Sequence, residues 1–258
     1  MATISENIQT LRSIKSDIKN AIIQKGGSVT DAFGTYAQAI TNLPSGGGGG
    51  TEIEDAFVTR TISKYSNDRI SVVGDFAFYH CSKLTSVYLP ICISVGGNAF
   101  AYCDSLTYVN LPLCKSLREG AFSNAILLQS ISLPNCSYIG NQAFIFCSTL
   151  KSINLPLCKS FDEGYFGRCS AFAYCSGLSI VKIPLCSYIG EATFKYCTNL
   201  KELYLNSVTS VATISANTFS ECPNLTSVYV PSSLVVEFMI APYWSSISRK
   251  IVGYRSIN

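Results

Sequence analysis

The sequence has few of the residues on which most catalytic and metal-binding sites depend. Its 258 residues include one histidine and one tryptophan, and Asp, Glu, Lys and Arg together make up 14%. The 19 basic and 16 acidic residues nearly balance, and a net charge of +3 is too small for a dedicated binder of nucleic acid or of anionic membranes. No apolar run approaches the roughly 20 residues of a membrane-spanning helix. We therefore expect no nucleic-acid partner and no insertion into a membrane.

Catalytic motifs are missing as well. No nucleophile motif accompanies the one histidine, His80, and the glycine run at 46–50 lacks the Lys that follows a phosphate-binding loop. We predict a protein that is not an enzyme and uses no cofactor. A receptor-degrading depolymerase is the enzymatic alternative, and the lack of paired acids in a groove argues against it.

The N-terminus lacks the apolar core of a secretion signal. It begins Met1-Ala2-Thr3-Ile4-Ser5-Glu6, with further charges in the turns that follow. We therefore expect synthesis in a cytosol without export by the usual route. A cytosol is reducing, which argues against disulfides as the role of the twelve cysteines.

The composition changes sharply at 46–50, where five consecutive glycines cannot pack or hold a helix. We interpret this stretch as a flexible tether between two units. The predicted segments are a helical anchor and oligomerisation module at 1–44, a glycine-rich linker at 45–51, an N-terminal cap at 52–70, repeats at 71–231 and a C-terminal cap at 232–258.

The first module carries two apolar stripes with helical spacing, which predict a short helical hairpin. The first stripe is narrow enough for a coiled coil, and Lys25-Gly26-Gly27 ends its helix. Two helices of this size bury little area alone, so we expect them to dock on copies of themselves or on a partner. We expect a homo-oligomer, and a trimer is one form it could take. The alternative is a hairpin lying on the repeats, against which the tether argues. The predicted anchor residues are Ile4, Ile8, Leu11, Ile18, Ile22, Phe33, Tyr36 and Ile40.

After the tether the chain repeats itself with a period of 22 residues. Each copy follows the pattern ψ-G-x-x-A-F-x-x-C-x-x-L-x-x-ψ-x-L-P-x-C, where ψ is an aliphatic residue or Phe. Insertions of six and three residues precede the fifth and the seventh copies. A repeat of this length predicts an α/β solenoid of about seven coils. The phenylalanines that mark the copies are Phe78, Phe100, Phe122, Phe144, Phe172, Phe194 and Phe219.

The pattern also predicts the structure within each coil. The Leu-x-x-ψ-x-Leu stretch alternates apolar and polar residues and should form a strand that ends at the proline. The Ala-Phe-x-x-Cys stretch, with apolar residues three apart, should form a short helical turn on the opposite side. Between them, an extended piece should lead to a glycine with a positive φ, at Gly74, Gly96, Gly140 and Gly190.

Eleven of the twelve cysteines fall into two columns of this repeat, one three residues after the Phe and one two residues after the Pro. Ala125 replaces the cysteine in the third copy, so the position favours a small apolar side chain, which a free cysteine provides. The spacing is not that of a zinc site, and columns of six and five leave at least one thiol unpaired in any regular disulfide scheme. We predict two ladders of buried, reduced cysteines and no metal site, with some disulfides as the alternative. Cys169, in the insertion, belongs to neither column.

The repeat resembles a known family. The copy at 139–156, IGNQAFIFCSTLKSINLP, is similar to the BspA-like (Treponema-type) leucine-rich repeat, and the likeness covers about 160 residues. It extends to a closing segment in which Trp244 would seal the last coil. The resemblance implies a solenoid used for adhesion or recognition, without enzymatic activity and commonly exported to the cell surface.

The N-terminal module resembles short modules at the N-termini of phage tail and fibre-like proteins, over about 25 residues at 18–43. A virion protein is assembled in the host cytosol, so this resemblance implies a non-enzymatic phage virion protein, a fibre or a capsid or tail accessory. Residues 1–44 would bind virion structural proteins, and the repeats would bind a host-surface glycan or protein. The alternative is a cellular BspA-like adhesin or interaction scaffold on a bacterial cell surface.

The outward positions of the predicted strands form two columns on the open face of the solenoid. They are rich in Tyr, Asn and Ser, which combine rigid aromatic contact with adaptable hydrogen bonding. A merely solvated face is the alternative. The predicted partner-binding residues are Tyr88, Tyr108, Asn110, Asn154, Lys182, Tyr204 and Tyr229.

A second column of rings directly precedes the cysteines, on the other side of each coil. We expect these rings to stack on one another as packing rather than to contact a ligand. The column contains His80, Tyr102, Phe146, Tyr174 and Tyr196.

Overall fold

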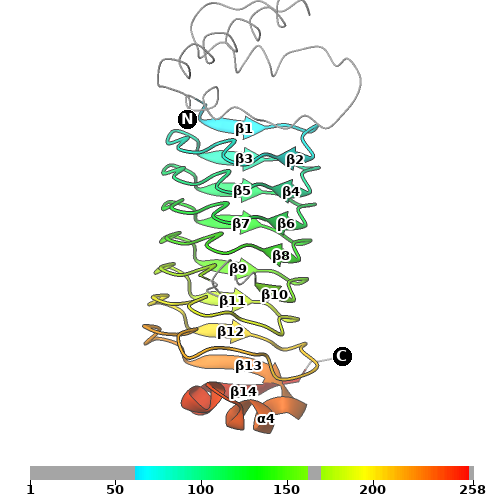
Figure 1. Cartoon of the computed structure of the whole chain (residues 1–258), viewed down its shortest axis with the longest axis vertical. Helices are drawn as coiled ribbons and strands as arrows, with labels where there is room; N and C mark the ends of the chain where they lie inside the picture. Colours follow the sequence, from blue (N-terminus) through cyan, green and yellow to red (C-terminus); the bar gives the residue numbers. More distant parts are fainter. Residues whose placement is uncertain (1–61, 162–169, 256–258) are drawn as a thin grey trace, which may run out of the picture.

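The computed structural model describes residues 62–161 and 170–255. The predicted anchor module, with Ile4, Ile8, Leu11, Ile18, Ile22, Phe33, Tyr36 and Ile40, lies outside these residues, as do the linker and Cys169. The described residues form a solenoid whose coils stack one upon the next, which confirms the predicted leucine-rich repeat architecture (Figure 1).

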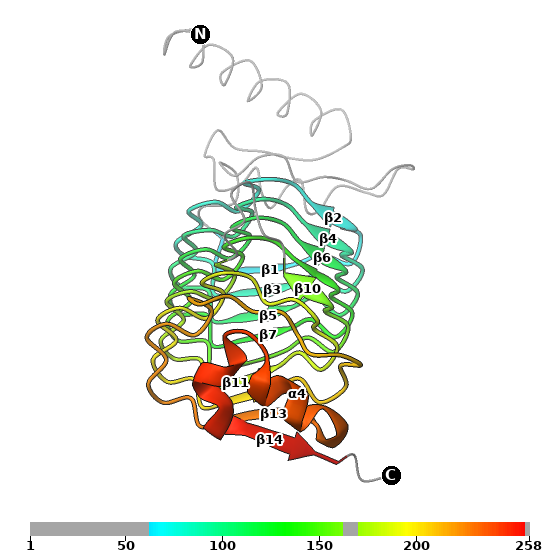
Figure 2. The same cartoon turned by 60° about the horizontal axis from the view of Figure 1, so that its bottom comes forward.

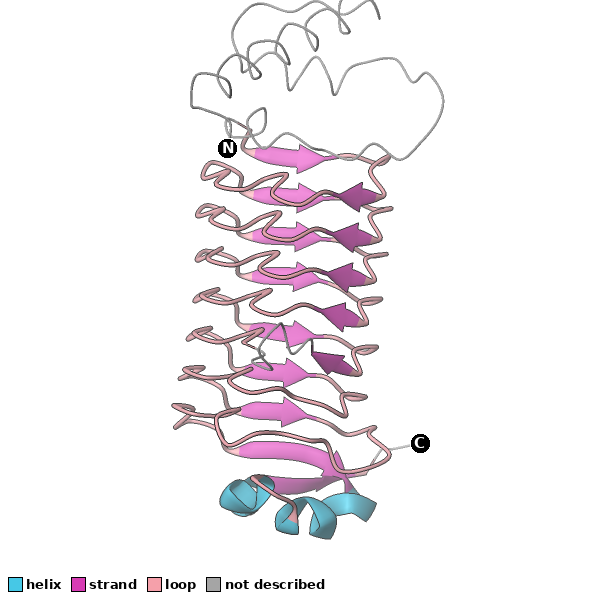
Figure 3. Ribbon diagram, in the orientation of Figure 1, coloured by secondary structure: helices cyan, strands magenta, loops and turns pink. Residues whose placement is uncertain are grey.

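The longer strands lie in one stack, which we call the front sheet (Figures 1 and 3). All its pairings are parallel, and Tyr88 pairs with Asn110, one repeat later. The predicted strands are therefore confirmed. In spatial order the front sheet contains β1 (Lys64–Ser66), β3 (Ser86–Tyr88), β5 (Tyr108–Asn110), β7 (Ser130–Ser132), β9 (Ser152–Asn154), β11 (Ile180–Lys182), β12 (Glu202–Tyr204), β13 (Ser227–Pro231) and β14 (Ile251–Tyr254).

A second parallel stack, the side sheet, follows the turn after each front strand. It uses the short extended piece that the repeat pattern predicts between the proline and the glycine. Isolated parallel bridges continue it through Tyr188 to Thr213. Its strands are β2 (Val72–Val73), β4 (Ser94–Val95), β6 (Ser116–Leu117), β8 (Tyr138–Ile139) and β10 (Ser160–Phe161).

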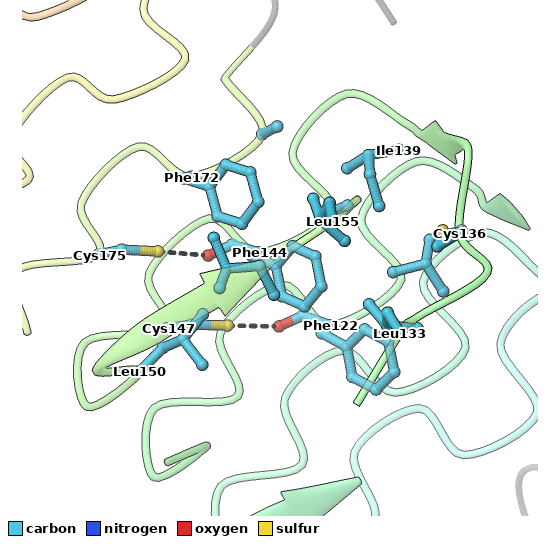
Figure 4. Close-up of a cluster of buried hydrophobic side chains, with 14 of the residues drawn as sticks. Phe122, Leu133, Cys136, Ile139, Phe144, Cys147, Leu150, Leu155, Phe172 and Cys175 are labelled. Atoms are coloured by element: carbon cyan, nitrogen blue, oxygen red, sulfur yellow. Dashed lines mark hydrogen bonds between the residues drawn. The ribbon is translucent and has the colours of Figure 1, made fainter. Parts of the chain in front are cut away.

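The interior is built from columns of identical or similar side chains. The phenylalanine rings of successive coils stack nearly parallel, with centroids 4.8–5.7 Å apart. Figure 4 shows this column from Phe122 to Phe172, with leucines and cysteines packed around it. Because burial of each such side chain contributes about 2 kcal/mol, the repeat supplies the core one coil at a time.

The Ala-Phe-x-x-Cys segments differ from the prediction, because within the described residues they form successive turns and no helix (Figure 3). In the first coil the N–H groups of Phe76, Phe78 and His80 donate to carbonyls of the next coil at 2.7–2.9 Å. Those of Tyr79 and Cys81 donate to the carbonyl three residues earlier. Alternate amides thus bond within and between coils, which a helix would not allow. We call these segments together the turn ribbon.

The turn ribbon holds bulky residues in the left-handed region of φ. The residue before each cysteine position has a φ of 58–63° in every described coil, and the bond between coils requires this conformation although it is costly for side chains other than glycine. The residues concerned are His80, Tyr102, Asn124, Phe146, Tyr174, Tyr196 and Glu221.

The repeated glycine has a different reason from the one predicted. None of Gly74, Gly96, Gly140 and Gly190 has a positive φ, and among the described glycines only Gly120, in another column, does. A Cβ on Gly96 would lie 2.5 Å from the nitrogen of Asp75, in the preceding coil. Glycine stands here because successive coils approach each other too closely for a side chain.

The C-terminal cap closes the end of the solenoid beside β13 and β14. It contains η1 (Ser232–Leu234), α4 (Val235–Ile240) and η2 (Trp244–Lys250). The indole N–H of Trp244 donates to the carbonyl of Ala212 at 2.6 Å, and its ring lies 5.9 Å from that of Phe219. The prediction that Trp244 seals the last coil is therefore confirmed.

Candidate functional site

The outward side chains of the front sheet form two columns, which together we call the front face. The register places Tyr88 beside Asn110, and Asn154, Lys182, Tyr204 and Tyr229 in one row across β9, β11, β12 and β13. Tyr108 lies in the neighbouring column. All seven predicted partner-binding residues therefore share this face, because the strand period of two turns every second residue outward. Their role in binding stays a prediction.

Two tyrosines lie at the N-terminal part of the front face. Tyr88 on β3 and Tyr108 on β5 occupy diagonal positions on adjacent strands, and each is 45% exposed. A half-exposed tyrosine offers an aromatic ring and a hydroxyl at low conformational-entropy cost, since it has only two side-chain torsions. We call them the N-terminal tyrosine pair.

A denser cluster lies at the C-terminal part of the front face. The rings of Tyr204 and Tyr229 stack with centroids 4.5 Å apart, and Tyr254 on β14 meets Tyr229 edge-on at 6.5 Å. The ammonium of Lys182 lies 5.4 Å from the ring centroid of Tyr204, a cation–π distance. The hydroxyl of Tyr204 donates to Glu202 at 2.9 Å. These residues form the C-terminal tyrosine cluster.

The protonation state of this cluster is fixed. Desolvation raises the pKa of Tyr204 to about 12, and the hydrogen bond and negative charge of Glu202 raise it as well. Tyr204 therefore remains a neutral hydroxyl at physiological pH. The cluster presents one cation, one carboxylate and stacked rings, which suits a partner surface with both apolar and charged groups.

The middle of the front face carries small polar side chains. Ser130, Ser132 and Ser152 separate the two aromatic ends, and the hydrogen-bonded sheet is interrupted between β7 and β9. Three strand steps separate β5 from β11, about 14 Å at the usual spacing. The face is thus low in the centre and aromatic at both ends.

The third coil contributes exposed apolar residues that the sequence analysis missed. Ile126 and Leu127 lie at the corner before β7, and both side chains are largely exposed. The hydroxyl of Thr149, in the next coil, donates to the carbonyls of Ile126 and Leu128 at 2.9 and 3.1 Å. The signal was available, because other copies have polar or small residues at the position of Ile126 and a conserved period makes the difference visible. Tyr254 was missed because it lies in the cap, outside the repeat.

The rings of the turn ribbon do not form a comparable surface. Their centroids are 4.6 Å apart for His80 and Tyr102, and 4.6–4.7 Å apart along Phe146, Tyr174 and Tyr196. Each stacked ring covers the face of its neighbour and leaves mainly its edge exposed. The predicted stacking is confirmed, and the interruption at Asn124 divides the column in two.

A hollow of about 370 Å³ lies on the turn ribbon beside Tyr174. Its floor contains Ala173 and Ala192, and at its rim the amide of Asn217 donates to Glu191 at 2.9 Å. Its volume is at the small end of the range for ligand pockets. The rim is already hydrogen-bonded to itself, so the front face is the stronger candidate.

The eleven described cysteines are buried and free, which confirms the two ladders. After the phenylalanine position, five thiols donate to the Phe carbonyl of the preceding coil at 3.0–3.1 Å, two of them drawn in Figure 4. After the proline position, all five donate to the carbonyl two residues ahead at 3.1–3.4 Å. A cysteine is thus more than a small apolar residue here, because it also satisfies a buried carbonyl.

Burial makes these thiols poor nucleophiles. It raises the pKa of Cys92 and of Cys222 to about 11, and it also raises the pKa of Cys147, Cys175 and Cys197. Since the thiolate is the reactive form, the ladders are structural. In the described parts of the chain, no group of three or more His, Cys, Asp or Glu residues could hold a metal ion. No helix between 62 and 255, the insertion aside, is long and apolar enough to cross a membrane.

Comparisons with known proteins agree with this architecture. The profile described as "BspA type Leucine rich repeat region" matches residues 55–171 and 168–237, in six copies. The crystal structure of the T. pallidum leucine-rich repeat protein TpLRR is similar, with 29% identity, a TM-score of 0.55, and coverage of 61% of this chain and 72% of that one. A leucine-rich repeat protein from Bacteroides ovatus is 22% identical with a TM-score of 0.37, over 75% of this chain and 66% of that one. No curated protein sequence matches the chain.

Proposed function

Because the chain belongs to the BspA type leucine-rich repeat family, we propose that it is an interaction scaffold of the adhesin kind whose front face binds a protein partner. Leucine-rich repeat solenoids typically act by binding, and the proposal contains no catalytic step. BspA-like relatives are cell-surface proteins, so a bacterial cell surface is the proposed location.

The observation that carries the proposal is the division of the front face into two aromatic ends. The interior columns repeat the same residue in nearly every coil, whereas the front face changes from Tyr to Ser to Lys along its rows. Stability requires only that such a face be polar. Tyrosines concentrated at its two ends match the composition of interface hot spots, where a few aromatic and charged residues supply most of the binding energy.

The proposed partner is a folded protein or an extended segment that contacts both ends of the face. The N-terminal tyrosine pair would supply ring contacts, and the C-terminal tyrosine cluster would supply ring contacts with Lys182 and Glu202. The small side chains of β7 and β9 leave room for the partner between them. Two weak contacts on one rigid support add their binding free energies, because the second forms without a new loss of translational freedom.

A binding panel tests the proposal. The full chain is assayed against immobilised extracellular-matrix proteins, bacterial surface proteins and host-surface glycans, in parallel with Tyr204→Ala and Tyr138→Ala. Tyr138 is a matched control, since it is 43% exposed on the side sheet. We expect a protein ligand whose binding falls at least tenfold in Tyr204→Ala and less than twofold in Tyr138→Ala. Equal loss in the two variants, or ligands that are only glycans, would contradict it.

A second candidate is the phage virion protein predicted from the sequence. The order of the segments favours it, since a helical module and a glycine tether precede the repeats. In that role residues 1–44 would anchor the chain to the particle as a homo-oligomer, and the front face would bind the host surface. Deletion of residues 1–44 should then abolish incorporation into particles, and incorporation of the truncated chain would refute the anchoring role.

A further inference from the structure

The C-terminal cap exposes the most apolar surface patch of the described residues. Val236 is 66% exposed and Ile240 is 75% exposed, and the side chains of Met239 and Tyr243 are also largely exposed. These four residues follow one another at steps of three and four along α4 and just beyond it, so they lie along one side of the cap. We call them the cap patch. Figure 2 shows α4 at the end of the solenoid, where it covers the last coil.

The exposed face of α4 is distinct from the face that packs on the core. Phe238 on the same helix is fully buried, and its ring meets Trp244 edge-on at 5.1 Å. One apolar residue therefore suffices to attach α4 to the solenoid, and the cap patch is in excess of what the cap needs. Tyr243 also has a φ of 64°, a left-handed conformation that a bulky residue adopts at a cost.

We propose that the cap patch pairs with the same patch of a second copy of this chain, giving a tail-to-tail dimer. In a two-fold contact the same surface serves both partners, so one patch needs no separate complement. The four side chains present on the order of 400 Å² per chain, in the range where the largest patch of a monomer is often functional. Two such patches and their polar rim bury about 1,200 Å² in total, the lower limit of a standard interface.

The charges around the cap patch favour a second copy over a lipid surface. Glu237 is exposed within the patch, and Arg249 is exposed on η2, which packs beside α4. Neither forms an ion pair with another described residue. In a two-fold contact Glu237 of each chain can meet Arg249 of the other, so both pairs form together. An anionic membrane would instead repel the carboxylate in the middle of the apolar stripe.

The dimer would direct two solenoids away from a shared centre. Each chain would then present its front face separately, and a surface carrying several partners could be bound by both. The pairing itself does not depend on the proposed function, because oligomeric state is measured without any ligand.

Sedimentation velocity of the full chain between 1 and 100 µM tests the dimer. We expect Ile240→Asp to halve the assembled mass or to weaken association at least tenfold. Leu157→Asp is the matched control, an exposed leucine away from the cap, and should leave association within twofold. Glu237→Arg and Arg249→Glu should each weaken association, and the two together in one chain should restore it.

Several outcomes would overturn the proposal. A wild-type chain that is monomeric at 100 µM would do so, as would an assembled mass unchanged in Ile240→Asp, which would assign association to another surface such as residues 1–44. Failure of the combined charge exchange to restore association would also contradict it. Binding of a monomeric chain to phosphatidylserine vesicles, lost in Ile240→Asp, would assign the patch to lipid. If circular dichroism shows that Ile240→Asp is unfolded, Val236→Ser and the charge exchange decide.

Discussion

The turn ribbon and the front sheet close the same coils and both carry columns of aromatic residues, yet they use them differently. On the turn ribbon Phe146, Tyr174 and Tyr196 cover one another's faces, and the backbone beneath them is held at positive φ. On the front sheet Tyr88 and Tyr108 project from an ordinary extended backbone and are about half exposed. Aromatic content alone therefore does not distinguish a binding surface from a packing surface. The arrangement of the rings and the conformation of the backbone do.

The largest effect should come from the interior that both regions share. We expect Phe144→Ala to lower the free energy of unfolding by about 4 kcal/mol, because it removes a fully buried ring and leaves a cavity between two stacked neighbours. Urea denaturation followed by circular dichroism measures the change. A loss below about 1 kcal/mol would show that the phenylalanine column does not support the coils.

The second effect concerns binding and should separate the two regions. For the partner found in the binding panel, Tyr88→Ala with Tyr108→Ala should weaken affinity by about 2 kcal/mol, because both ring contacts of that end are lost. Tyr174→Ala on the turn ribbon should change affinity by less than twofold. Calorimetric titration of the three chains makes the comparison. A loss in Tyr174→Ala as large as in the front-face variant would remove the distinction.

The third effect is a loss of stability at high pH caused by the cysteine ladders. Burial raises the pKa of Cys92 and Cys222 from 9.0 to about 11 in the folded chain, so the protonated thiol is the form that the fold favours. The unfolded chain releases these protons first, and stability should be constant below about pH 8 and fall as the pH rises from 9 to 11. Urea midpoints measured with a reductant across this range test it.

A matched variant identifies the thiols as the cause. Cys222→Ala uses a residue that the same column already accepts at Ala125, and it should reduce the pH dependence by up to one proton. A slope unchanged in Cys222→Ala would assign the effect to other groups.

The fourth effect is smaller and reverses the second. We expect Tyr174→Ala to lower the free energy of unfolding by about 1 kcal/mol, because it loses two ring contacts and leaves a side chain at positive φ. Tyr108→Ala should change it by less than about 0.5 kcal/mol, since the side chain is half exposed. Thermal unfolding of both variants tests the contrast, and equal destabilisation would contradict it.

The smallest effect tests the backbone of the turn ribbon. Gln142 has a φ of 57°, and in the preceding coil the same column contains Gly120 with a φ of 64°. Gln142→Gly should therefore raise the free energy of unfolding by about 0.5 kcal/mol, because relief of the left-handed strain exceeds the entropy cost of glycine. A decrease would show that the ribbon does not strain this residue.

The repeat pattern was sufficient to predict the solenoid, the front strands and the two cysteine ladders. Each of these follows from one residue recurring at a fixed spacing, and an error in one coil is corrected by its neighbours. The pattern also placed Tyr88, Lys182 and Tyr229 on a common face, since the strand register advances by one repeat.

Features that depend on backbone geometry could not be predicted in this way. The turn ribbon was expected to be helical because apolar residues lie three apart, but left-handed residues between them let alternate amides reach the next coil. No glycine marks most of these positions. The glycines that do recur were assigned to positive φ, whereas close approach of the coils requires them. The interruption between β7 and β9 and the cap patch lie where the repeat itself is irregular.

The central claim is that the front face binds and the turn ribbon packs, and hydroxyl-radical footprinting of the tyrosines tests it most directly. The chain is oxidised alone and with its bound partner, and the modification of each tyrosine is measured by mass spectrometry. We predict protection of Tyr88, Tyr108, Tyr204 and Tyr229 by the partner, with Tyr138 and Tyr174 unchanged. Protection of Tyr138 or Tyr174, with the four front-face tyrosines still fully reactive, would contradict the account.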